Sequence, residues 1–233
     1  MYEIKMAGPG KNALGFEMMQ FLIDELKRAA GQPVLLTGDG DAFSAGLNLR
    51  EVAAQDEAGM DRFLRLLNQM TVALFTYPAP TVAWVNGHAI AGGAVLALCC
   101  DYRIGTPNPK SRIGLNEVAI GLRFPPTVLA VLRAQLAQPH TDTVILAAEL
   151  HPPLEAQRLG VLHEVAEDGL ARAHARLALL GGYAPDAYAG TKADLRDAVV
   201  RVDAAEEARY QRDVLPMWTS PVIKAKILAI LKR

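Results

Sequence analysis

The chain has 233 residues, of which 51% are hydrophobic and 21% charged, and its formal net charge at pH 7 is -1. These values predict a single globular chain with a sizeable core and exclude a disordered protein. A nearly neutral chain generates no general field for nucleic acid, so we predict no nucleic-acid partner and expect any anionic ligand to be bound locally.

No stretch of the sequence has the ~18 to 20 unbroken apolar residues of a membrane-spanning helix, and the N-terminus lacks a signal pattern. We therefore predict a soluble cytoplasmic protein without membrane insertion. The two cysteines, Cys99 and Cys100, are adjacent in an apolar run, which excludes a disulfide framework and the spacing of a zinc site. The histidines show no ligand spacing either, so we predict no metal.

The first part of the chain predicts short strands alternating with helices. Residues 1–6 are typical of a strand, and apolar positions at helical spacing predict a helix over 14–30. Residues 34–37 predict a second strand, and 43–49 a loop that leads into a helix. A further helix is expected over 59–77, ending before two prolines.

The next stretch carries the sharpest chemistry of the sequence. A β-branched run at 81–85 predicts a strand, and the small-residue turn Ala91-Gly92-Gly93 precedes an apolar segment of helical length, 94–100. The first N–H groups of a helix have no intrahelical partner, so a glycine turn here can present donors to an anion or a polarised carbonyl.

After residue 125 the sequence is mostly helical. A strand is expected at 161–165, and Ser220-Pro221 gives the last helix an N-cap and a proline at its first position. No repeat or linker divides the chain, so we distinguish only a core, 1–165, from a helical C-terminal region of the same chain, 166–233. The predicted helices cover residues 127–136, 141–150, 153–159, 170–180, 191–203, 205–218 and 220–233.

Three motifs occur in order: DAFSAGLNL at 41–49, VNGHAIAGG at 85–93 followed by CDYRI at 100–104, and IGLNEVAIG at 113–121. Together they resemble the crotonase superfamily, the enoyl-CoA hydratase/isomerase family. The resemblance implies an α/β fold of the ββα-spiral type with a helical C-terminal trimerisation region. It also implies an acyl-CoA thioester substrate, no cofactor besides the CoA of that substrate, and a homotrimer or a dimer of trimers.

The resemblance implies an oxyanion hole made by the backbone N–H groups of Leu47 and Gly92, which donate to the thioester oxygen. The adjoining Ala45, Gly46 and Gly93 are predicted to bind substrate. Fixed donors aimed at a developing oxyanion are each worth roughly a hundred- to thousand-fold in rate. Ordinary turns are the alternative for any one glycine pair, but the three motifs together favour the site.

Two positions decide the expected reaction. Hydratases of this family carry a glutamate at the position of Val95 and a second one at that of Glu117. Hydration needs a base to activate water and an acid to protonate C2, and valine can do neither. Moving a double bond from the 3,4 to the 2,3 position needs one base, so we predict an isomerase with Glu117 as its catalytic residue. Val95 is then expected to line the substrate site.

Two other functions stay open at this stage. The same scaffold and oxyanion hole serve hydratases and other thioester-enolate enzymes. A catalytically silent acyl-CoA-binding or structural subunit is the alternative from another class, and the retained Glu117 argues against it. The apolar sequence neighbours Leu115, Val118 and Ile120 are expected to raise the pKa of Glu117.

The remaining expected contacts rest on the resemblance alone. Met60, Phe63 and Leu67 are candidates for the acyl pocket, with core packing as the alternative, and Leu122 is a further substrate-binding candidate. Arg50 is expected near the nucleotide end of CoA or else as a solvated surface side chain. The basic residues expected to meet the CoA phosphates or to form a solvated face are Lys224, Lys226, Lys232 and Arg233.

One residue departs from the family pattern. Asn48 stands where the family generally has aspartate, and we expect it to weaken a hydrogen bond that orders the loop while leaving the backbone donors in place.

Overall fold

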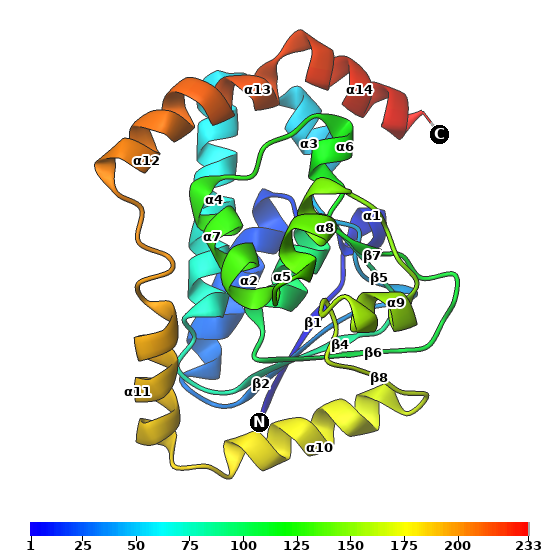
Figure 1. The fold of residues 1–233 in the computed structure, drawn as a ribbon, viewed down its shortest axis with the longest axis vertical. Helices are drawn as coiled ribbons and strands as arrows, with labels where there is room; N and C mark the ends of the chain where they lie inside the picture. Colours follow the sequence, from blue (N-terminus) through cyan, green and yellow to red (C-terminus); the bar gives the residue numbers. More distant parts are fainter. Residues whose placement is uncertain (233) are drawn as a thin grey trace.

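The computed structural model, shown in Figure 1, describes residues 1–232. Its larger sheet has five parallel strands in the order β1-β2-β4-β6-β8. These are β1 (Tyr2–Met6), β2 (Val34–Gly38), β4 (Thr81–Val85), β6 (Tyr102–Gly105) and β8 (Glu164–Val165). A smaller parallel sheet has the order β3-β5-β7, from β3 (Ala42–Ser44), β5 (His88–Ile90) and β7 (Ile113–Gly114).

The chain alternates between the two sheets. Three successive turns each add one strand to the larger sheet, the next strand to the smaller sheet, and then a helix, as in the succession β4, β5, α5, whereas β1 and β8 have no following strand in the smaller sheet. This arrangement confirms the predicted ββα spiral. Because all strands of one sheet run the same way, the loops after β3, β5 and β7 meet at one end, where the three sequence motifs lie.

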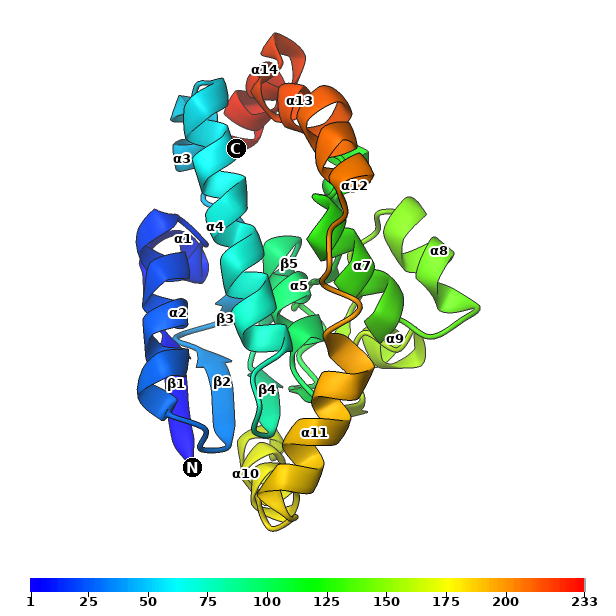
Figure 2. The same ribbon diagram turned by 90° about the vertical axis from the view of Figure 1, so that its left-hand side faces the viewer.

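Helices cover both faces of the larger sheet (Figures 1 and 2). On one face α10 packs on β4 and β6 and buries the small cluster Leu35, Val82, Ile104, Ala173 and Leu177. The main core lies on the other face, under α2, α4, α5 and α7. The helices of the first part are α1 (Pro9–Asn12), α2 (Phe16–Ala29), α3 (Leu49–Ala54), α4 (Glu57–Phe75), α5 (Gly92–Cys99), α6 (Glu117–Ile120) and α7 (Pro126–Gln135).

The later helices run around the outside and return to the top of α4 (Figure 2). They are α8 (His140–Leu146), α9 (Pro153–Arg158), α10 (Gly169–Gly181), α11 (Pro185–Arg196), α12 (Ala204–Arg209), a π-helical turn (Tyr210–Val214), α13 (Leu215–Thr219) and α14 (Pro221–Leu231). The predicted N-cap of the last helix is confirmed, since the Ser220 hydroxyl accepts a hydrogen bond from the Ile223 amide.

Two short segments differ from the prediction. The expected loop 43–49 begins as strand β3, whose three residues are too few to show a period of two. The expected strand 161–165 is reduced to its last two residues. The amides of Val161 and Leu162 both donate to the carbonyl of Ala156, so these residues close the end of α9 instead of joining the sheet.

Three predicted helices have different bounds. The helix expected over 141–150 is α8, which ends at Leu146. The helix expected over 191–203 is α11, which begins at Pro185 and ends at Arg196, because polar contacts inside the protein, rather than an apolar stripe, order it. The helix expected over 205–218 is interrupted by the π-helical turn. Pro216 follows that turn and has no N–H to donate, which breaks the regular bonding of an α-helix.

Within residues 1–232 no single helix is long and apolar enough to cross a membrane, although the bent pair Ala204–Thr219 and Pro221–Leu231 passes the same test of length and composition.

Candidate active site

A narrow cavity lies where α4, α5, α6, α7 and α13 meet. About 20 Å³ of it is accessible to a water-sized sphere. The structure brings three predicted catalytic residues, Leu47, Gly92 and Glu117, together with Val95 in its lining. The lining comprises Leu47, Leu67, Gly92, Val95, Glu117, Phe124, Pro125, Val128 and Trp218.

Glu117 is the only carboxylate in this lining, and its environment is apolar. The residue is 7% exposed, and its Oε2 has no hydrogen-bond partner among the described residues. Burial raises the pKa of Glu117 from 4.5 to about 8, although its own amide and that of Asn116 act in the opposite direction. A carboxyl with a pKa near neutrality can both accept and return a proton.

The apolar surroundings of Glu117 are not all its sequence neighbours. Val118 is 41% exposed, so it does not bury the carboxyl, and neither Leu115 nor Ile120 lines the cavity. The desolvation comes from residues distant in sequence, such as Leu67 of α4 and Trp218 of α13. The expected rise in pKa is present, but Val118, one of its three expected sources, is exposed and does not contribute to it.

Leu47 and Gly92, whose backbone N–H groups are the predicted donors, line the same cavity as the Glu117 carboxyl. Within the described chain, neither of them donates a backbone or side-chain hydrogen bond. A Cβ atom placed on Gly92 would lie 3.6 Å from the Leu47 nitrogen and 3.3 Å from Leu47 Cδ2, so the two amides are neighbours. Two free donors side by side can bind one developing oxyanion.

The peptide planes of both donors are fixed through their oxygen atoms. The carbonyl before the Leu47 amide, that of Gly46, accepts a hydrogen bond of 2.8 Å from the Leu14 amide. The carbonyl before the Gly92 amide, that of Ala91, accepts one of 3.0 Å from Val95. In a trans peptide the C=O and N–H point in opposite directions, so each bond also fixes the direction of the free N–H.

Close backbone packing explains the glycines of this site. Gly46 has φ 88°, and a Cβ there would lie 2.6 Å from the Ile90 carbonyl oxygen. A Cβ at Gly93 would collide with the carbonyl oxygen of Ser44. The first and second motifs therefore touch backbone to backbone, which only glycine allows at these positions.

The family of the chain follows from comparison of the whole sequence and fold. The family described as Enoyl-CoA hydratase/isomerase matches residues 1–220. The chain belongs to the enoyl-CoA hydratase/isomerase family. Its similarity to mitochondrial enoyl-CoA delta isomerase 1 of Mus musculus is 30% identity over 178 residues, 74% of this chain and 62% of that protein. For the Homo sapiens protein of that name the values are 28% over 215 residues, 90% and 70%.

Solved structures of this family have the same fold. The fold is similar to that of human mitochondrial delta3-delta2-enoyl-CoA isomerase, with a TM-score of 0.90, 26% identity, and coverage of 99% of this chain and 92% of that one. It is also similar to enoyl-CoA hydratase from Bacillus halodurans, with a TM-score of 0.83, 25% identity, and coverage of 97% and 95%. The crotonase-type fold is thereby confirmed, while both activities occur among similar structures.

The turn that presents Gly92 holds a feature that the sequence did not reveal. Ala91 has φ 51° and ψ -118°, a conformation that non-glycine residues rarely adopt. It is held there by the hydrogen bond from its amide to the Gly114 carbonyl, 2.8 Å, and by the Val95 amide on its own carbonyl. Strain of this kind persists only where the surroundings impose it, and here it lies immediately before an oxyanion donor.

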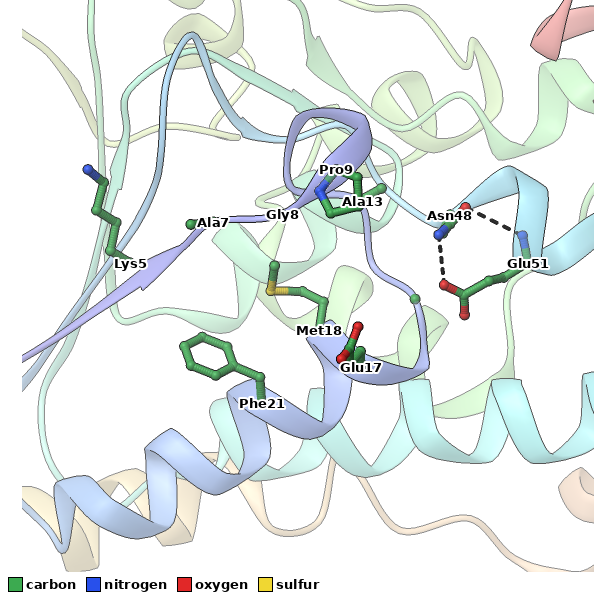
Figure 3. A pocket seen from close by; sticks show the side chains of 11 residues that line it. Lys5, Ala7, Gly8, Pro9, Ala13, Glu17, Met18, Phe21, Asn48 and Glu51 are labelled. Atoms are coloured by element: carbon green, nitrogen blue, oxygen red, sulfur yellow. Dashed lines mark hydrogen bonds between the residues drawn. The ribbon is translucent and has the colours of Figure 1, made fainter.

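In this family member the departure at Asn48 does not weaken its loop. The Asn48 carbonyl Oδ1 caps α3 by accepting from the Arg50 and Glu51 amides at 3.2 and 3.4 Å. Its Nδ2 donates to Glu51 Oε1 at 2.7 Å, and Figure 3 shows this pair. An aspartate could cap the helix equally but would place a second carboxylate against Glu51, so the amide suits this site.

The other residues predicted to contact the substrate do not line the narrow cavity. Ala45 and Arg50 line a surface cleft of about 460 Å³ that Leu47 separates from the narrow cavity and that Leu231 of α14 borders. Met60, Phe63 and Leu122 are buried in the main core and do not line the cavity. Lys224 donates to the Gln55 carbonyl at 2.7 Å, and Arg233 lies outside the described residues.

A second hollow, of about 440 Å³, lies beyond the Pro9–Ala13 loop and holds Lys5, Met18 and Phe21 but none of the predicted site residues (Figure 3). Within residues 1–232 no three His, Cys, Asp or Glu side chains come together in a way that could hold a metal ion.

Sequence reasoning missed four residues of the cavity lining: Phe124, Pro125, Val128 and Trp218. Trp218 is 2% exposed, and its Nε1 donates to the Arg123 carbonyl at 3.1 Å, which fixes the ring over the cavity. No motif marks this tryptophan, since it comes from α13 at the far end of the chain.

Proposed function

We propose that this chain is an enoyl-CoA isomerase that converts 3-enoyl-CoA to 2-enoyl-CoA. The observation that carries the proposal is the cavity lining, in which Glu117 is the only proton-transfer group and Val95 occupies the other hydratase position. The similarity to two mitochondrial enoyl-CoA delta isomerases supports it.

The proposed reaction uses one carboxylate and two amides. Ionised Glu117 removes a proton from C2 of the thioester, and the negative charge moves to the thioester oxygen. The N–H groups of Leu47 and Gly92 bind that oxyanion. The electrons then return, the double bond forms between C2 and C3, and protonated Glu117 delivers its proton to C4. One proton is removed and one is returned, so neither water nor a cofactor is consumed.

The neighbouring cleft supports CoA as the carrier of the acyl group. It continues from Leu47 past Ala45 to Arg50, whose guanidinium can meet a phosphate. We expect Arg50→Ala to raise the KM for acyl-CoA several-fold with little change in kcat, while Arg133→Ala, on the exposed side of α7, leaves both unchanged. Equal affinities of acyl-CoA and acyl-pantetheine by calorimetry would remove Arg50 from this role.

Assembly into a trimer or a dimer of trimers stays a prediction of the family resemblance. Exposed apolar side chains on outer helices support contacts between copies. They are Leu154 of α9, Leu179 of α10, Leu195 of α11 and Val222 of α14, which are 53 to 70% exposed.

The test of the proposal compares two substrates. The absorbance of the conjugated thioester should rise quickly with trans-3-hexenoyl-CoA, whereas hydration of crotonyl-CoA should be slower by at least about tenfold, since Val95 cannot position a water. Val95→Glu is expected to shift this ratio toward hydration. If the wild type hydrates crotonyl-CoA efficiently and does not act on 3-hexenoyl-CoA, the isomerase proposal is wrong and the protein is a hydratase.

A further inference from the structure

Three consecutive residues near the N-terminus adopt a left-handed backbone. Gly10, Lys11 and Asn12 have φ of 67°, 59° and 59°. This conformation is unfavourable for residues with a Cβ and does not persist without outside support. The segment, α1, therefore depends on contacts with the rest of the protein.

The Asn12 side chain supplies those contacts. Asn12 is 2% exposed, and its Nδ2 lies 3.0, 2.9 and 3.3 Å from the carbonyl oxygens of Asp39, Ala42 and Phe43. Its Oδ1 accepts from the Gly8 amide at 3.2 Å. One buried amide thus joins the start of α1 to the chain on both sides of the turn before β3.

Backbone bonds continue from this segment into the first motif. The Ser44 hydroxyl donates to the Asn12 carbonyl at 2.8 Å and accepts from the Gly46 amide at 3.2 Å. The Ala45 amide donates to the Lys11 carbonyl at 3.0 Å. Residues 11–12 are therefore joined directly to residues 44–45 by two hydrogen bonds.

Leu14, two residues after Asn12, contacts the peptide that carries the Leu47 donor. Its amide donates to the Gly46 carbonyl at 2.8 Å, and its carbonyl accepts from the Asn48 amide at 3.0 Å. The first bond holds the carbonyl oxygen of the peptide between Gly46 and Leu47, whose N–H is the free donor. The second bond holds the amide of the next residue, Asn48. The orientation of the Leu47 N–H thus depends on where α1 places Leu14.

We propose that Asn12 is a positioning residue for the oxyanion hole, acting through Leu14 on the peptide between Gly46 and Leu47. This inference rests on the proposed function only in taking the Leu47 amide as a donor to a thioester oxygen. It concerns how strongly that oxygen is polarised, which can be observed without turnover.

The test uses Asn12→Gly, because glycine keeps the left-handed backbone open while removing every side-chain bond. The probe is 2,4-hexadienoyl-CoA, whose absorbance band moves to longer wavelength when its carbonyl is polarised. We expect the variant to bind it within about threefold of the wild-type Kd but to lose at least half of the spectral shift. The kcat for 3-hexenoyl-CoA should fall by roughly ten- to a hundredfold.

Two further variants keep the test decisive. Tyr188→Phe removes a hydrogen bond of 2.9 Å to Asp101, away from the cavity lining, and should keep the full shift. If Asn12→Gly does not fold, Asn12→Ser tests the same residue, because its short side chain cannot make all the contacts of the amide, and it should lower the shift to a smaller extent.

The outcomes separate this inference from the proposed function. A folded Asn12→Gly or Asn12→Ser protein with the full wild-type shift would overturn the inference. Wild type that binds the probe without any shift would also overturn it. Wild type that shifts the band in an Asn12-dependent way but does not isomerise 3-hexenoyl-CoA would support the inference and refute the proposed isomerase.

Discussion

Two carboxylates of low exposure, Asp101 and Glu117, have opposite surroundings. Asp101 accepts from the Thr81 amide at 2.7 Å, the Tyr188 hydroxyl at 2.9 Å, Lys192 Nζ at 2.9 Å and Arg196 Nη1 at 2.8 Å. Glu117 leaves one oxygen without any partner in the described chain. A buried charge with full hydrogen bonding holds structure together, whereas one left unpartnered keeps a proton available for exchange.

The two sites also differ in what they connect. Asp101 lies just before β6, and its partners Lys192 and Arg196 come from α11, so this network fixes the outer helical region to the sheet. Glu117 is surrounded by apolar side chains, which do not pair with its charge. The comparison predicts that removal of the first charge affects stability and that removal of the second affects chemistry.

The largest effect is expected on turnover. Glu117→Gln keeps the size of the side chain but cannot accept the C2 proton, so kcat for 3-hexenoyl-CoA should fall by ~10² to 10⁴. Asp101→Asn should keep kcat per folded molecule within about threefold, because no Asp101 atom reaches the cavity. Stopped-flow absorbance, with circular dichroism as the check of folding, measures both. Similar losses of kcat in the two variants would contradict the division into a structural Asp101 and a catalytic Glu117.

A second large effect should come from the amides beside Glu117. Gly92→Pro removes the N–H at the first position of α5, where proline suits the helix, so catalysis should fall at least about a hundredfold. Gly92→Ala is the control, since it keeps the N–H and places a Cβ 3.3 Å from Leu47 Cδ2. It should lose less than about tenfold. A folded proline variant with unchanged turnover would show that Gly92 is no donor.

The free energy of unfolding should move in opposite directions in the two carboxylate variants. Asp101→Asn leaves Lys192 and Arg196 buried without their counter-ion and should cost about 3 kcal/mol in urea unfolding. Asp41→Asn breaks an exposed pair with Lys11 and should leave the free energy of unfolding essentially unchanged, because solvent screens that pair.

Glu117→Gln should instead be stabilising at alkaline pH. The pKa of Glu117 is raised to about 8 in the folded protein, so the stability that its protonated form contributes is full below about 4.5 and lost as the pH rises through about 8. At pH 8 the variant should therefore exceed the wild type by on the order of 4 kcal/mol, and the difference should vanish near pH 4. A wild type more stable than the variant at pH 8 would contradict the burial cost.

The same comparison predicts how the rate depends on pH. Since the base must be ionised, kcat/KM for 3-hexenoyl-CoA should rise about tenfold per pH unit below pH 7 and level off above a pKa of about 8. Asp101→Asn should show the same profile as the wild type. A flat profile between pH 6 and 8 would mean that Glu117 is already ionised and that its burial has no kinetic role.

The sequence predicted those parts of the fold and site that rest on local chemistry. The glycine turn at Gly92 and the cap at Ser220 were recognisable from residue types and their order, whereas the candidate base Glu117 was predicted from the family resemblance of its motif. In contrast, the strain at Ala91 could not be read from an alanine. Trp218 reaches the cavity from the far end of the chain, and α11 is ordered by Asp101, so both depend on contacts that no local pattern records.

The most direct test of the single-base account follows one hydrogen. With 3-hexenoyl-CoA carrying deuterium at C2, the account predicts that product formed in the first turnovers in ordinary water carries deuterium at C4. The same buried Glu117 takes and returns it, and its 7% exposure slows exchange with solvent. Mass spectrometry of product and unreacted substrate gives the answer. Product whose C4 hydrogen comes only from solvent, while unreacted substrate keeps its label, would contradict a single carboxylate.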